Sequence, residues 1–229
     1  MTGTNALLST PLLRKNAPKS LAGYARFRQV LDNDGALPAR IKALYLAIVA
    51  TTKGYEAMAA RELARGHGLG LTFDEAASGA TILCSVRGEG ASLRFIGILE
   101  QTYPDRADAE TPLAEITVAD GEARDNFLAY FGSMPPSLGK LVDHLPIAAD
   151  AYYLMREGTL ATTPIGKKYA ELLLCAVIAA DYSTLVAVHA KGAMTAGASE
   201  TELYEALLCA VPVSGLSGWV AAINAIEAQ

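Results

Sequence analysis

The chain has 229 residues, of which 52% are hydrophobic and 19% charged, and its formal net charge at pH 7 is −5. This length can bury a real core, either as one large domain or as two small ones. The acidic balance lacks the basic surface that binding to nucleic acid or to an anionic membrane requires. Aromatic residues make up only 7% of the chain, and the abundance of Ala and Leu favours packed helices over sheet.

The cysteines and the apolar runs indicate the class of protein. Cys84, Cys175 and Cys209 lie far apart, with no CxxC pair and no metal-ligand spacing, so we expect free thiols in a reducing cytoplasm and no metal site. The most apolar segment, 172–180, is too short to cross a bilayer, and the N-terminal residues lack a signal-peptide pattern. The sequence therefore predicts a soluble cytoplasmic protein with no membrane partner.

In chain order, the first half predicts helices separated by Gly54 and Gly70, followed by a capping box at 72–75. The segment 102–120 is acidic and contains two prolines, which indicates a surface linker. A helix from about 122 to 132 should follow, then a buried helix over 169–179 and a further helix to about 196. Gly197 should end that helix, and a second capping box lies at 199–202.

The two halves of the chain resemble each other. Shifting the sequence by 127 residues places 43–100 on 170–227 without a gap, and the identical pairs include Tyr55/Tyr182, Gly70/Gly197, Glu75/Glu202 and Gly88/Gly215. Glycines and capping residues mark helix ends, so their recurrence indicates a repeated architecture. We therefore predict an all-α fold of two homologous units packed as an intramolecular pseudo-dimer, with unit boundaries at 1–103 and 122–229 and a linker at 104–121.

Among the three histidines, His189 is the best candidate for chemistry. His67 and His144 lie where helices should end, and a cap or an exposed position explains them. His189 lies within an apolar helix, where a charge is costly unless it is paired. Tyr182, Leu185 and His189 are spaced to share one helix face, and an imidazole near a phenol can act as a general acid or base. The alternative is a core histidine satisfied by one hydrogen bond.

Glu171 is the second candidate. It lies in an otherwise apolar helix, where a carboxylate needs a partner or a raised pKa. Lys167, Lys168 and His189 are possible partners. Glu75 and Glu202, by contrast, each fill the last position of a capping box, and that role explains them.

The segment from Tyr182 to His189, followed by Gly197 and Glu202-Leu203, resembles the signature helix pair of the carboxymuconolactone decarboxylase and AhpD-like superfamily. Glu171-Leu172 matches a Glu-Leu pair on the preceding helix of that pattern. The resemblance covers 166–218 and, in a degenerate form, 39–91. It implies an all-α unit without a cofactor, and single-unit relatives that assemble into trimers and hexamers. A homo-oligomer of this double unit, a trimer or a dimer, is therefore expected.

The sequence departs from the peroxidase branch of this superfamily. The two cysteine positions of that branch correspond to Tyr182 and Leu185, and to Tyr55 and Met58 in the first copy. None of these can form a thiolate, which excludes thiol-peroxidase chemistry. In the first copy Glu62 takes the place of the histidine, so it either contributes an acid to a site of its own or belongs to a supporting unit.

The leading hypothesis is a cofactor-free acid–base enzyme acting on a small carboxylated or lactone-like metabolite, as a decarboxylase-like lyase or an isomerase. His189 would move the proton, with Tyr182 or Glu171 orienting it or stabilising an enolate-type intermediate. Two alternatives stay open. One is a hydrolase like the all-helical haloacid dehalogenases, with Glu171 or Glu62 as the base. The other is a non-catalytic protein that keeps the scaffold for binding or assembly.

Overall fold

The computed structural model describes residues 5–106 and 111–228, and these contain helices and no strand. The predicted all-α class is therefore confirmed. None of the described helices has the length and apolar character needed to cross a membrane. Residues 107–110 of the predicted linker lie outside the described part of the chain.

The helices of the first half are α1 (Ala6–Ser9), α2 (Pro11–Asn16), α3 (Pro18–Asp32), α4 (Ala39–Thr52), α5 (Glu56–Gly68), α6 (Phe73–Arg87) and α7 (Glu89–Thr102). Those of the second half are α8 (Glu122–Phe131), α9 (Pro136–His144), α10 (Pro146–Leu160), α11 (Lys167–Ala179), α12 (Val186–Thr195), α13 (Glu200–Leu208), α14 (Val211–Ser214) and α15 (Leu216–Glu227).

The helix ends follow the local sequence signals. Thr72 and Ser199 each accept a hydrogen bond from the backbone three residues on, and both capping boxes are complete. Gly70 and Gly197 have φ values of +86° and +88°. Only glycine adopts this left-handed backbone without steric cost, so it ends α5 and α12 at equivalent places.

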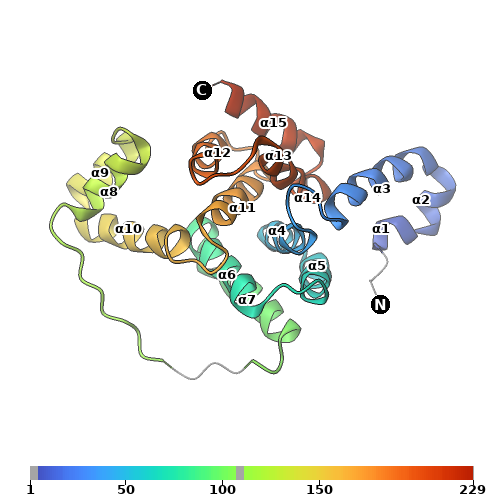
Figure 1. Cartoon of the computed structure of the whole chain (residues 1–229), viewed down its shortest axis with the longest axis horizontal. Coiled ribbons are helices and arrows are strands. Elements are labelled where there is room, and N and C mark those ends of the chain that lie inside the picture. Colours follow the sequence, from blue (N-terminus) through green and yellow to red (C-terminus); the bar gives the residue numbers. More distant parts are fainter. Residues whose placement is uncertain (1–4, 107–110, 229) are drawn as a thin grey trace.

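Two apolar helices, α4 and α11, form the centre of the molecule and pack against each other (Figure 1). Ten of the thirteen α11 residues are buried, from Ala170 to Ala179. Tyr45 of α4 is fully buried, and its hydroxyl donates to the carbonyl of Tyr169 at 2.7 Å. A helix that is apolar nearly all round belongs in a core, and these two bring the halves of the chain into one hydrophobic cluster.

The contacts between the halves are reciprocal. Helix α3 packs against α13, and α10 packs against α6. Helices α3 and α10 begin with Pro18 and Pro146 and have the same length, while α6 and α13 both follow a capping box. Fully buried Lys42 of α4 donates to Glu205 of α13 at 2.9 Å, which anchors the first half on the second.

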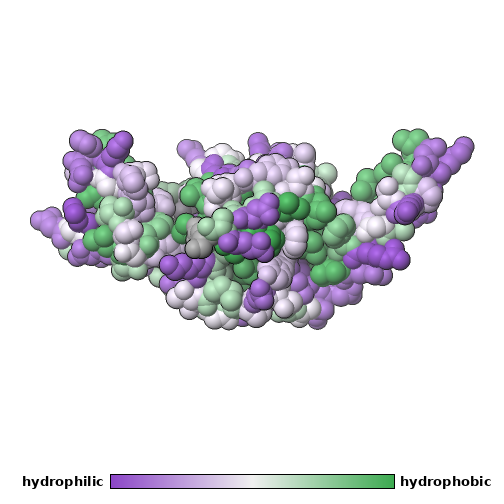
Figure 2. Space-filling view, turned by 90° about the horizontal axis from the view of Figure 1, so that it is seen from above, coloured by the Kyte–Doolittle hydropathy of each residue, from purple (hydrophilic) through white to green (hydrophobic). Residues whose placement is uncertain are grey.

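A helical hairpin, α8 and α9, lies on α10 at one end of the molecule. It has a small core of its own, in which Ala123 and Phe127 pack with Ala149. Figure 2 shows this end and the opposite end, which carries α1 and α2, rising on either side of the central mass. The hairpin therefore brings side chains of α8 and α9 over one flank of the helical core.

Candidate active site

His189 of α12 and Glu171 of α11 form the polar centre of the candidate site. The Nδ1 atom of His189 lies 2.8 Å from Oε2 of Glu171. The Glu171 side chain is fully buried, whereas that of His189 is 22% exposed. Of the three partners that the sequence offered for Glu171, the structure selects His189. A carboxylate only accepts hydrogen bonds, so with ionised Glu171 the donor is Nδ1, and a neutral imidazole then has its lone pair on Nε2.

Tyr130 of α8 binds the other oxygen of Glu171. Its hydroxyl donates to Oε1 at 2.9 Å. Burial and the negative charge of Glu171 raise the pKa of Tyr130, so the phenol stays protonated and remains a donor. Both carboxylate oxygens are thus occupied, and the Glu171 side chain is held in one orientation.

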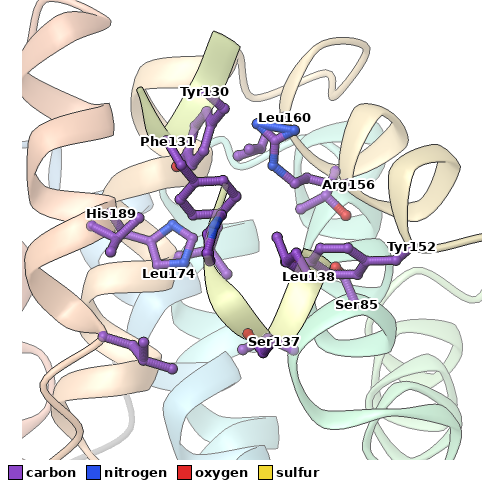
Figure 3. Close-up of a pocket in the computed structure, with 15 residues that line it drawn as sticks. Ser85, Tyr130, Phe131, Ser137, Leu138, Tyr152, Arg156, Leu160, Leu174 and His189 are labelled. Atoms are coloured by element: carbon purple, nitrogen blue, oxygen red, sulfur yellow. The ribbon is translucent and has the colours of Figure 1, made fainter. Parts of the chain in front are cut away.

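A cavity of about 240 Å³ opens over His189. Its wall is mainly apolar and includes Phe131, Leu138, Leu174 and Val188. Figure 3 shows Tyr130 and Phe131 at the middle of this region, with His189 on one side and Arg156 on the other. Helix α6 of the first half adds Ser85 and Val86, so both halves of the chain build the wall.

Arg156 of α10 is the cation of this cavity and is only 7% exposed. Its guanidinium lies over the Tyr130 ring, 3.8 Å from the centroid, and Nη1 donates to Oδ1 of Asn126. The carboxylate of Glu157 lies 4.0 Å from Nη1. A ring face, a neutral amide and one carboxylate at the limit of ion-pair distance hold the guanidinium in place. Its remaining donors favour an anionic or electron-rich ligand group in the cavity.

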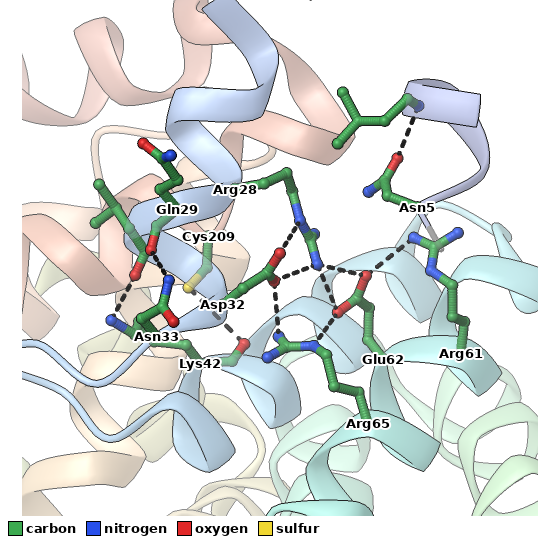
Figure 4. Close-up of polar contacts among 12 residues, drawn as sticks. Asn5, Arg28, Gln29, Asp32, Asn33, Lys42, Arg61, Glu62, Arg65 and Cys209 are labelled. Atoms are coloured by element: carbon green, nitrogen blue, oxygen red, sulfur yellow. Dashed lines mark hydrogen bonds and ion pairs between the residues drawn. The ribbon is translucent and has the colours of Figure 1, made fainter. Parts of the chain in front are cut away.

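Glu62 lies in the first half, in a buried ion cluster away from this cavity (Figure 4). Arg28 donates to it at 3.1 Å, Arg65 at 2.9 Å and Arg61 at 2.9 Å. Burial alone would raise the pKa of Glu62, but the charges of Arg28 and Arg65 outweigh it and hold this pKa below its ordinary value. An ionised carboxylate surrounded by three guanidinium groups is saturated, which favours the supporting role over an acid with a site of its own.

Tyr182 lies outside the cavity, and its predicted place on one helix face with Leu185 and His189 is wrong. Its φ of +58° is left-handed, and α12 begins only at Val186. The Tyr182 side chain is half exposed, and its hydroxyl donates to the carbonyl of Ser214 at 2.6 Å. A left-handed residue interrupts the helical spacing, so an i, i+7 argument does not extend across it.

Among the described residues, neither the cysteines nor the groups of potential metal ligands form a second candidate site. Burial raises the pKa of Cys175 well above its ordinary value and that of Cys209 to about 12, whereas Cys84 is exposed. Within residues 5–106 and 111–228, no group of three or more His, Cys, Asp or Glu side chains is placed to hold a metal ion.

Sequence reasoning missed Arg156 and Tyr130. A signal for Arg156 was present, because the same shift that places Pro18 on Pro146 places Arg28 on Arg156. Both arginines are buried, at 4% and 7% exposure. For Tyr130 we find no local signal, since its role depends on how the α8–α9 hairpin packs on α10 and brings Tyr130 to Glu171.

The chain was compared with known protein families and with curated proteins. Residues 146–228 match the model of the carboxymuconolactone decarboxylase family, a segment that spans α10 to α15 and contains Arg156, Glu171 and His189. No curated protein matches the chain. This segment of the chain is therefore similar to the carboxymuconolactone decarboxylase family.

Proposed function

We propose that this protein is an acid–base enzyme that moves a proton on a small carboxylated or lactone-like substrate bound in the His189 cavity. The observation that carries the proposal is the contact between His189 Nδ1 and the fully buried Glu171, 2.8 Å apart, at the wall of a cavity. A carboxylate that fixes the tautomer of a histidine, with the second ring nitrogen left over, is the arrangement of a general base.

The chemistry follows from the groups that surround the cavity. His189 Nε2 would accept a proton from the carbon beside a carbonyl group, and Glu171 would stabilise the imidazolium that forms. Arg156 would stabilise the negative charge that develops on the enolate oxygen. In a decarboxylation, the C–C bond to the carboxylate would break with loss of CO₂ and leave its electron pair on carbon. An imidazolium that has taken up a proton from water would then donate it to that carbon. Decarboxylation, isomerisation and lactone opening share these proton transfers.

We also propose that the chain consists of two tandem units, with a first unit at 1–103 and a second at 122–229, joined by the linker 104–121. Counterpart helices in the two halves and left-handed glycines at matching ends support this division. The reciprocal packing of α3 on α13 and of α10 on α6 supports a pseudo-dimer, since a two-fold interface uses the same patch of both partners.

The first unit then acts as the scaffold of the second. The Arg28 and Glu62 pair occupies the positions that correspond to Arg156 and His189. In the first copy these positions form a bonded ion pair, whereas in the second they line a cavity.

The proposed partner is a further copy of the chain, in a homo-oligomer. Two large apolar side chains at the start of α10, Leu145 and Ile147, are 60% and 84% exposed, and contact with a second copy would cover them. Light scattering coupled to gel filtration tests this, and a monomeric mass would refute it.

The free thiols support a reducing, cytoplasmic location.

The proposal is tested by proton exchange, which requires no knowledge of the overall reaction. The purified protein is incubated in D₂O with a panel of small keto acids, unsaturated acids and carboxylated lactones. NMR then records deuterium incorporation beside the carbonyl group, together with any ring opening or loss of CO₂. We expect His189→Gln and Glu171→Gln to reduce the rate by about 100-fold or more, the usual contribution of a positioned acid–base group.

His67→Gln is the matched control. His67 lies on α5, away from the cavity, and its ring packs at a tilt against that of Tyr103 with a centroid distance of 4.5 Å. This variant should keep the exchange rate of the unsubstituted protein. If His189→Gln folds normally and exchanges as fast as His67→Gln on a substrate that the protein turns over, His189 is not the base and the proposal fails.

A further inference from the structure

A second cavity, of about 480 Å³, adjoins the His189 cavity. Tyr130, Phe131, Arg156 and Val188 line both. The aromatic pair of α8 therefore lies at the boundary between the two spaces. Arg156 also borders both spaces, so a molecule long enough to extend from one cavity into the other can contact its guanidinium.

The second cavity is positively charged, although the chain as a whole is acidic. Lys167, Lys191 and Arg156 line it, against the single carboxylate of Glu157. Lys168, next to Lys167, is bound to Glu202 at 2.7 Å, whereas Lys167 and Lys191 form no ion pair with any residue of 5–106 and 111–228. Like charges gathered in a concave site concentrate the potential there and attract an anion.

The helices hold these cations toward the same space. Val188, Lys191, Gly192 and Thr195 are spaced at i, i+3, i+4 and i+7 along α12, and all four line the second cavity. His189 belongs to the adjoining cavity. Helix α11 begins at Lys167, and its N-cap is Gly166, which has no side chain to cap the first amides. The positive end of the helix dipole therefore adds to the charge of the lysines.

We propose that this second cavity, the anion chamber, binds the terminal phosphate or carboxylate of an elongated substrate. This inference rests on the proposed function, because the reacting end of that substrate would lie at His189. The apolar wall of the first cavity would hold the middle of the molecule, and Arg156 the polar group nearest the reacting carbon. Lys167 and Lys191 would neutralise the far end.

The test measures binding of hexyl phosphate, hexanoate and hexanol by isothermal titration calorimetry. We expect both anions to bind more tightly than hexanol, and the tighter of the two anions identifies the end group. The double variant Lys167→Gln/Lys191→Gln should weaken binding of the preferred anion at least about tenfold, without changing the affinity for hexanol. The charge-preserving double variant Lys167→Arg/Lys191→Arg should bind the anion to within about threefold of the unsubstituted protein.

The matched control is Lys19→Gln/Lys140→Gln, which removes the same charge from two exposed lysines outside the chamber. It should leave the affinity for the anion unchanged. Equal weakening by both glutamine double variants would reduce the effect to net charge and overturn the proposal, as would anions that bind no better than hexanol.

The same titrations in His189→Gln separate this inference from the proposed function. Anion binding that persists in this variant supports the chamber whatever happens to proton exchange. Failure of the exchange experiment with intact lysine-dependent binding would remove the proposed chemistry and leave the chamber. Lysine-independent binding with normal catalysis would remove the chamber alone.

Discussion

Replacing Glu62 by Gln tests the view that the first half supports the site and has none of its own. Arg28, Arg61 and Arg65 all donate to this carboxylate, whose side chain is only 1% exposed. Glutamine keeps the size but removes the charge, which leaves the buried Arg28 with Asp32 as its remaining acid. Breaking a buried ion pair from one side costs about 3–5 kcal/mol, a large part of a stability of roughly 5–15 kcal/mol.

The assay is thermal and urea unfolding, followed by circular dichroism and by the fluorescence of Trp219. For a chain of this size, about 3 kcal/mol corresponds to a midpoint lower by roughly 6–12 °C. The control is Glu56→Gln, which breaks the exposed pair of Arg94 and Glu56 at 3.1 Å and should cost under about 1 kcal/mol.

The effect of Glu62 should also depend on pH. Because its pKa is lower in the folded state than its ordinary value of 4.5, its contribution to stability is complete above about pH 4.5 and is lost as the pH falls through the depressed folded pKa. The gap in unfolding free energy between Glu62→Gln and the unsubstituted protein should therefore narrow in acid. The reasoning is refuted if Glu62→Gln is no less stable than Glu56→Gln, or if it abolishes turnover while its stability is unchanged.

Three further predictions concern single positions. Gly192→Ala should impair proton exchange more than it lowers stability, because the Cβ of the new alanine would lie 2.6 Å from Oε1 of Glu171 and displace that carboxylate. An unchanged exchange rate would show that the orientation of Glu171 does not matter. Tyr182→Phe should lose only about 1 kcal/mol of unfolding free energy with its hydrogen bond and keep full exchange activity, and a loss of activity in a folded variant would return Tyr182 to the site. In a thiol-reagent titration at pH 8, the exposed Cys84 should react quickly. Burial raises the pKa of Cys175 and of Cys209, so these two thiols should react only on unfolding. Three fast thiols in the folded protein would contradict their burial.

The sequence by itself determined the features that depend on local chemistry. The two capping boxes and the left-handed Gly70 and Gly197 are where the pattern predicted them, because a cap requires only residues within one turn of each other. The burial of α11 also follows from its composition. The same composition showed that Glu171 needs a partner, since a carboxylate among apolar residues is costly alone.

Only the tertiary structure decided which groups meet at the site. His189, rather than Lys167 or Lys168, binds Glu171, because α11 and α12 pack face to face. Tyr130 reaches the same carboxylate from 41 positions earlier in the chain, through a hairpin whose place depends on its packing against α10. Tyr182, which the helical spacing predicted at the site, is itself left-handed and lies outside the cavity. Spacing fixes a face only within an unbroken helix, and contacts between helices depend on the packing of the whole core.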